Sequence, residues 1–230
     1  MDPLAEKYYS TSPYAYVLNN PIIFIDPDGR EVRFATQEEA EIAARELNEV
    51  HENQTNITVE ERTRDVVKKE WWDIFGWFSE TVTESYYALS TSDSDFDWSE
   101  QKYTMALYDV INSDEIIFNV RMVSGDTRLF GHPLNLSAYQ AQGKMESRPG
   151  GGTVTVSKDG NRLNEKVGVV LMHELVGHGH PAGGNNAHSI NNYYNRKLGL
   201  SISGSRGIGH EGYHKRIGWT NEQINLFKKQ

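Results

Sequence analysis

Residues 167–188 read VGVVLMHELVGHGHPAGGNNAH and contain four of the eight histidines in the chain. The first six residues are almost entirely apolar and lead directly into His173-Glu174-Leu175-Val176-Gly177-His178. We interpret the apolar run as a buried helix, although so short a run is also compatible with a strand. Two neutral imidazoles can hold a zinc ion, and a carboxylate beside them can take a proton from bound water. The stretch therefore predicts a zinc site with His173 and His178 as ligands and Glu174 as the general base.

The spacing of the two histidines differs from that of the common zinc helix. In H-E-x-x-H the ligands stand at i and i+4, about 40° apart around the helix. Here the second histidine stands at i+5, roughly 140° away on a regular α-helix. Both imidazole nitrogens must come within roughly 3–4 Å of each other to share one zinc ion. We therefore predict a break or a π-type widening between Val176 and His178, with Gly177 there because glycine tolerates the distortion.

The six residues H-E-L-V-G-H resemble the HExxGH motif of the dipeptidyl peptidase III family of zinc peptidases. In that family the same extra residue separates the two histidines. The resemblance covers only these six residues. It implies a zinc peptidase in which His173 and His178 bind the metal and Glu174 activates water, so we expect a zincin-like domain.

A catalytic zinc ion usually has three protein ligands and one water. In related peptidases the third ligand is a carboxylate on the next helix, but the helix predicted here at 187–198 has no carboxylate. His188, which opens that helix, is therefore the predicted third ligand. Asn191 or Asn192 on the same helix is expected to orient a ligand imidazole. Possible auxiliary groups, either as further ligands or as stabilisers of the transition state, are His180, His210, Tyr213 and His214.

Composition narrows the class of protein. The 230 residues allow one domain, or a domain with an appendage. The net charge of −9 and the pI of about 5.4 argue against a large nucleic-acid footprint, which requires a basic surface. The absence of cysteine leaves histidines, carboxylates and amides as metal ligands and excludes disulfides. No apolar run reaches the length of a membrane span.

Residues 2–30 form a separate pattern, DPLAEKYYSTSPYAYVLNNPIIFIDPDGR, in which Pro, Asn, Asp and Gly punctuate short aromatic and β-branched runs. The residues alone predict a turn-rich β segment, which could also be a hairpin capping the domain. The succession Y-x-Y, N-N-P and D-P-D-G resembles the end of the RHS-repeat-associated core domain. Asp26 and Asp28 fall where that family places its self-cleavage motif, and Arg30 replaces the usual leucine.

The RHS resemblance implies a domain organisation and a biological context. Residues 1–30 would be the end of an RHS core and residues 31–230 a C-terminal toxin domain, so that the chain is a fragment of a larger bacterial protein. We expect that protein to be secreted or delivered into a target cell. The implied partners are the RHS shell, a protein or peptide substrate and a cognate immunity protein. Two alternatives stay open, a metal-dependent nuclease toxin and a non-catalytic module stabilised by a metal or by structural histidines.

The rest of the sequence predicts an α+β fold with a small sheet packed on the active-site helix. A capping box opens a helix at 37–50, Ser99 caps a second helix that runs to Ile111, and Asn164 caps the helix that carries His173. Alternating apolar residues predict strands at 57–62, 81–89, 116–123 and 153–157. The strand around Val154 is expected to align an extended peptide by main-chain pairing. The remaining predictions are an aromatic cluster at 71–78, a loop at 149–152 and a C-terminal helix opened by residues 220–223.

Overall fold

The computed structural model describes residues 31–68, 80–92, 94–113, 116–129, 136–141, 143–184, 187–200 and 217–219. The predictions for the N-terminal β segment, for the aromatic cluster and for the C-terminal helix lie outside these residues. Contacts between residues divide the chain into two units. The larger unit consists of Gly29–Arg62 and Ser85–Gln230, and the smaller consists of Met1–Asp28 and Thr63–Glu84.

Five α-helices, two 3₁₀ segments and one π-helix lie in the described part of the chain. The α-helices are α2 (Gln37–Val50), α3 (Lys102–Ile111), α4 (Ala138–Ala141), α5 (Val167–Met172) and α6 (His188–Lys197). The 3₁₀ segments are η3 (Trp98–Glu100) and η5 (Pro181–Gly183), and the π-helix is η4 (His173–His178), which continues α5 directly.

Local signals explain where the helices begin, with two corrections. The hydroxyl of Thr36 accepts a hydrogen bond from the Glu39 N–H and caps α2, as the capping box predicts. Ser99 does not cap α3; it lies inside η3, which Asp97 caps, and α3 begins three residues later. Asn164 does not cap α5 either, because Lys166 takes that position and Asn164 adopts a left-handed backbone with φ of 56°.

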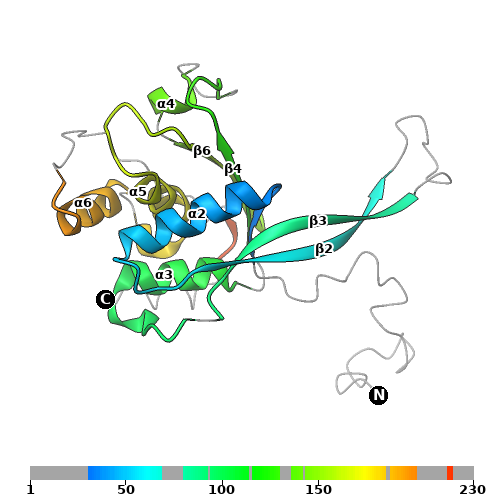
Figure 1. The fold of residues 1–230 in the computed structure, drawn as a ribbon, viewed down its shortest axis with the longest axis horizontal. Helices are drawn as coiled ribbons and strands as arrows, with labels where there is room; N and C mark the ends of the chain where they lie inside the picture. Colours follow the sequence, from blue (N-terminus) through cyan, green and yellow to red (C-terminus); the bar gives the residue numbers. More distant parts are fainter. Residues whose placement is uncertain are drawn as a thin grey trace. The chain divides into compact units, whose positions relative to one another are not determined.

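A mixed six-stranded sheet has the order β2-β3-β1-β4-β6-β5 (Figure 1). Its strands are β1 (Glu31–Phe34), β2 (Thr58–Lys68), β3 (Glu80–Ser90), β4 (Ile117–Val123), β5 (Gly143–Arg148) and β6 (Gly151–Ser157). The central strand β4 runs parallel to β1 and β6, whereas β3 and β5 run antiparallel to β1 and β6 respectively. The four predicted strands are present. The loop predicted at 149–152 is shorter than expected, because its last two residues begin β6.

The described residues of the smaller unit are the segments Thr63–Lys68 of β2 and Glu80–Glu84 of β3. Polar side chains connect the two strands there. The Thr83 hydroxyl donates to Asp65 at 2.7 Å, and Glu84 forms ion pairs with Lys68 at 3.1 Å and Arg64 at 3.6 Å. These groups are largely exposed, and exposed ion pairs contribute little to stability.

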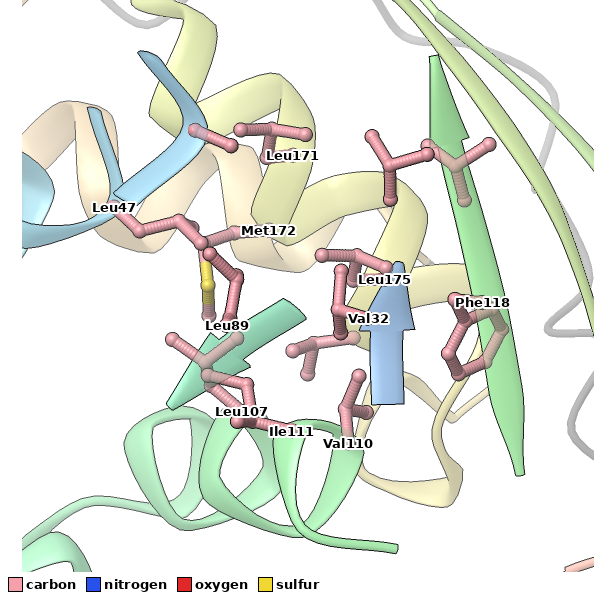
Figure 2. Close-up of a cluster of buried hydrophobic side chains, with 14 of the residues drawn as sticks. Val32, Leu47, Leu89, Leu107, Val110, Ile111, Phe118, Leu171, Met172 and Leu175 are labelled. Atoms are coloured by element: carbon pink, nitrogen blue, oxygen red, sulfur yellow. The ribbon is translucent and has the colours of Figure 1, made fainter. Parts of the chain in front are cut away.

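The core of the larger unit surrounds α5 and the beginning of η4. Every residue of Val167–Met172 is buried, and the run is a helix rather than a strand. Figure 2 shows Leu171, Met172 and Leu175 among side chains from β1, β3, β4, α2 and α3. Burial of each such side chain stabilises the fold by about 1.5–3 kcal/mol. The helix that leads to His173 is therefore held in the hydrophobic core, with α2 and α6 packed on it (Figure 1).

Candidate metal centre

The backbone widens into a π-helix over the whole motif His173–His178. The N–H of Gly179 donates to the carbonyl of Glu174 at 3.1 Å, a bond that spans five residues instead of four. The predicted widening is confirmed, and it is longer than the segment between Val176 and His178 in which we expected it. A π-type turn brings residues at i and i+5 to the same side of the helix, as the two histidines require.

The two imidazoles converge as a result. The Nε2 atoms of His173 and His178 lie 3.1 Å apart, and the rings meet edge to face. Two Zn–N bonds of about 2.0–2.1 Å at a tetrahedral angle place their nitrogens about 3.3 Å apart. The observed separation therefore suits a single metal ion between the two side chains.

Gly177 serves a different purpose from the one predicted. Its φ is outside the left-handed region, so the widened turn does not need the conformational freedom of glycine. The reason is space, because a Cβ at this position would lie 2.9 Å from the Cβ of Ala187. The Gly177 carbonyl also packs so closely on Gly183 that a Cβ there would come within 2.1 Å of it. Glycine at position 177 therefore allows η5 and the start of α6 to pack closely against the motif.

Glu174 completes the group. Its side chain is buried, and Oε2 has no hydrogen-bond partner among the described residues. Burial raises the pKa of this carboxyl to about 8. An unsatisfied buried oxygen costs free energy and therefore calls for an explanation, of which a bound ion or a catalytic role is one. Donor atoms from Glu174 and the two histidines all lie within 4.8 Å of one another, so the three residues could hold a metal ion. Nitrogen and carboxylate donors together suit zinc.

Asn191 is the amide that contacts a ligand imidazole. Its Oδ1 lies 2.5 Å from Nδ1 of His173. Asn191 is buried, whereas the neighbouring Asn192 is half-buried and lines a surface pocket together with Tyr103 and Arg196. Of the two amides that the sequence proposed for this role, the structure selects Asn191.

The other predicted site residues differ in their surroundings. His188 lies beside the centre, with its ring centroid 5.1 Å from that of His173, but it is not part of the group of convergent donors. Its role as the third ligand stays a prediction. His180 accepts a hydrogen bond from the Ala182 N–H, lies 3.4 Å from Asp109 and packs edge to face on Trp219. The bond from Ala182 caps η5, and His180 lies outside the group of convergent donors. The residues His210, Tyr213 and His214 lie outside the described part of the chain.

Two residues near the centre were not predicted from the sequence. Trp219 donates from its indole N–H to the Gly179 carbonyl at 2.6 Å and so closes the end of the π-helix. Glu165 is buried and accepts a hydrogen bond from Asn191 at 3.0 Å. An acidic residue just before an apolar helix is the only sequence signal for Glu165, and it does not distinguish a partner of the site from a solvent-exposed charge.

The comparisons with known proteins do not extend these observations. No family model, no curated protein and no solved structure matches the chain. Within the described residues, no helix is both long and apolar enough to cross a membrane.

Proposed function

We propose that the chain is a zinc-dependent peptidase in which Glu174 is the general base. The observation that carries the proposal is the convergence of the His173 and His178 Nε2 atoms, 3.1 Å apart, beside a buried carboxylate oxygen that lacks a partner among the described residues. An unpaired buried oxygen destabilises the fold by about 1–3 kcal/mol. A pair of histidines with a purely structural role would give no reason to keep such a destabilising carboxyl group beside it.

The residues have separate roles in the proposed reaction. His173 and His178 hold the zinc ion, and His188 is the expected third ligand. When bound, zinc polarises the substrate carbonyl and lowers the pKa of water. Oε2 of Glu174 accepts a proton from the attacking water and returns it to the nitrogen of the leaving amine. The water oxygen thereby bonds to the scissile carbon, the C–N bond breaks, and one proton of the water reaches the leaving nitrogen through the Glu174 carboxyl group.

The geometry of the sheet supports an extended peptide as the substrate. The strand expected to align it, β6, is paired on both sides with β4 and β5 and has no free edge. The edge strand beside β6 is β5, whose outer side pairs with no strand among the described residues. Gly143 at the start of β5 is so close to Glu174 that a Cβ there would lie 2.7 Å from Oε1. A peptide that adds to the edge of β5 therefore passes beside the proposed base.

The biological setting of the proposal comes from residues 2–30. Their likeness to the end of an RHS core supports a role for residues 31–230 as the toxin domain of a larger bacterial protein, delivered into a target cell and neutralised by an immunity protein. Expression inside bacterial cells addresses this role. The wild-type domain should stop growth and the Glu174→Gln variant should not, whereas equal growth with both would remove the toxin proposal and leave the peptidase proposal standing.

Three substitutions test the chemistry. Glu174→Gln should keep bound zinc and lower the hydrolysis of an unstructured protein by about 10²–10⁴-fold, because the proton acceptor is lost. His173→Ala and His178→Ala should lose both zinc and activity. The measurements are zinc content by mass spectrometry and cleavage of casein, with Glu61→Gln at an exposed position as the control. Full activity of Glu174→Gln, or zinc-dependent cleavage of nucleic acid instead of protein, would refute the peptidase.

A further inference from the structure

Glu165 lies immediately before α5 and is buried between that helix and α6. Each of its carboxylate oxygens accepts a hydrogen bond from an amide of α6. Asn191 donates to Oε2 at 3.0 Å, and Asn195, one helical turn further on, donates to Oε1 at 2.9 Å. A carboxylate can accept but cannot donate, so both amides must turn their NH₂ groups toward Glu165.

The loop before α5 holds this carboxylate in place. The side chain of Asn161 accepts from the N–H groups of Leu163 and Glu165, at 3.0 and 3.2 Å, and donates to the Glu165 carbonyl at 2.8 Å. Asn164, which lies between Leu163 and Glu165, adopts a left-handed backbone conformation, and the chain turns there. Three hydrogen bonds from one buried asparagine therefore fix the backbone from which Glu165 extends.

The orientation of Asn191 determines the tautomer of His173. With its NH₂ group turned to Glu165, Asn191 presents only its carbonyl oxygen to Nδ1 of His173, at 2.5 Å. Nδ1 must then carry the hydrogen, and Nε2 keeps a lone pair directed at His178. A metal ligand needs this lone pair, and a partner at the other ring nitrogen fixes the ring and strengthens the ligand.

We propose that Glu165 is a positioning residue of the metal centre, which locks Asn191 and through it selects the metal-binding tautomer of His173. This inference rests on the proposed function for the identity of the ligand, but the selection of the tautomer does not require metal. Glu165 touches neither metal nor substrate and acts only through the Asn191 amide.

The first test is Glu165→Gln in the full chain. The glutamine amide can donate as well as accept, so it no longer requires both asparagines to turn their NH₂ groups toward it. Asn191 can then turn its NH₂ group to His173 and favour the tautomer with hydrogen on Nε2. Zinc affinity, measured by competition with a chromophoric chelator, should fall about 10–100-fold. In metal-free protein, the ¹⁵N shifts of the His173 ring should report the change of tautomer. Glu31→Gln is the control, because it removes another buried carboxylate, one that accepts from Tyr86 and Arg62.

A double variant separates positioning from mere stability. In Glu165→Gln/Asn191→Asp the amide and the carboxylate exchange places. The introduced glutamine can donate to the introduced aspartate and accept from Asn195, and the aspartate can accept from Nδ1 of His173. Zinc affinity should return to within a few-fold of the wild type. Asn191→Asp alone sets two carboxylates side by side and should bind zinc more weakly than the double variant.

The outcomes distinguish the two proposals. Loss of affinity and a changed tautomer in Glu165→Gln, with rescue in the double variant, supports the inference. Unchanged zinc affinity and an unchanged His173 tautomer in Glu165→Gln overturn it, as does an equal loss of affinity in Glu31→Gln. If the wild type binds no zinc, the proposed function fails. The tautomer measurement then still decides whether Glu165 sets the protonation pattern of His173.

Discussion

His51 makes the stability of the fold depend on pH. It is the C-cap residue of α2, and only 2 % of its surface is exposed. Nδ1 donates to the Leu47 carbonyl at 2.7 Å, and Nε2 accepts from the Tyr194 hydroxyl of α6 at 2.9 Å, so the neutral ring satisfies both partners. Burial lowers the pKa of His51 from 6.5 to about 4; the Leu47 hydrogen bond opposes this shift, and the charge of Lys197 adds to it.

The sign and size of the effect follow from linkage. The unfolded chain takes up a proton near pH 6.5 and the folded chain only near pH 4, so the free energy of unfolding falls as the pH drops through this window. At about 1.4 kcal/mol per pH unit, the full loss is about 3 kcal/mol, of which about 2 kcal/mol is reached at pH 5. A small domain has only about 5–15 kcal/mol of stability, so the loss is a substantial fraction of it.

Urea unfolding at several pH values from 7.5 to 4 measures this loss. His51→Gln can still accept from Tyr194 and cannot take up a proton, so the difference in stability between wild type and variant should shrink by about 3 kcal/mol on acidification. Tyr194→Phe should retain the full pH dependence, because burial is the main cause of the lowered pKa. Parallel curves for wild type and His51→Gln would refute the reasoning.

Two further predictions concern packing and domain organisation. Gly168→Ala places a Cβ 2.2 Å from the carbonyl oxygen of Glu46 in α2, and should lower the free energy of unfolding in urea by about 1–3 kcal/mol; an unchanged urea midpoint would show that the contact between α2 and α5 can relax freely. Deletion of residues 2–30 should leave the thermal midpoint of the remainder within a few degrees if they end a separate RHS core. Loss of cooperative unfolding in the deleted chain would show instead that they belong to this domain.

Local sequence patterns were sufficient to predict much of the fold and the widened turn that carries His173 and His178. The capping box at Thr36 and the apolar spacing after it predicted α2, because both signals act within one helical turn. The widened turn followed from the requirement that His173 and His178 share a metal although five residues separate them. In both cases the physical constraint lies within a few consecutive residues.

Features that depend on distant partners could not be predicted in the same way. β1 has only four residues and forms because β3 and β4 flank it. β5 has a largely polar sequence, and only its pairing with β6 identifies it as a strand. Glu165 meets Asn191 across 26 positions of sequence, a contact that exists only after α5 and α6 have packed. The order of the strands and the support of the metal centre are therefore tertiary properties.

The π-helix is equivalent to one residue inserted into a helical turn, and its position limits the consequences. An insertion in the middle of a long helix rotates every later side chain by about 100° and moves the apolar face away from the core. Here the chain leaves the helix immediately after His178, through Gly179 and the turn that begins at Pro181. No residue after His178 continues this helix, so no later side chain is rotated by the extra residue. The extra residue of H-E-L-V-G-H is therefore accommodated at the end of the helix, and a sequence search restricted to H-E-x-x-H would overlook such a centre.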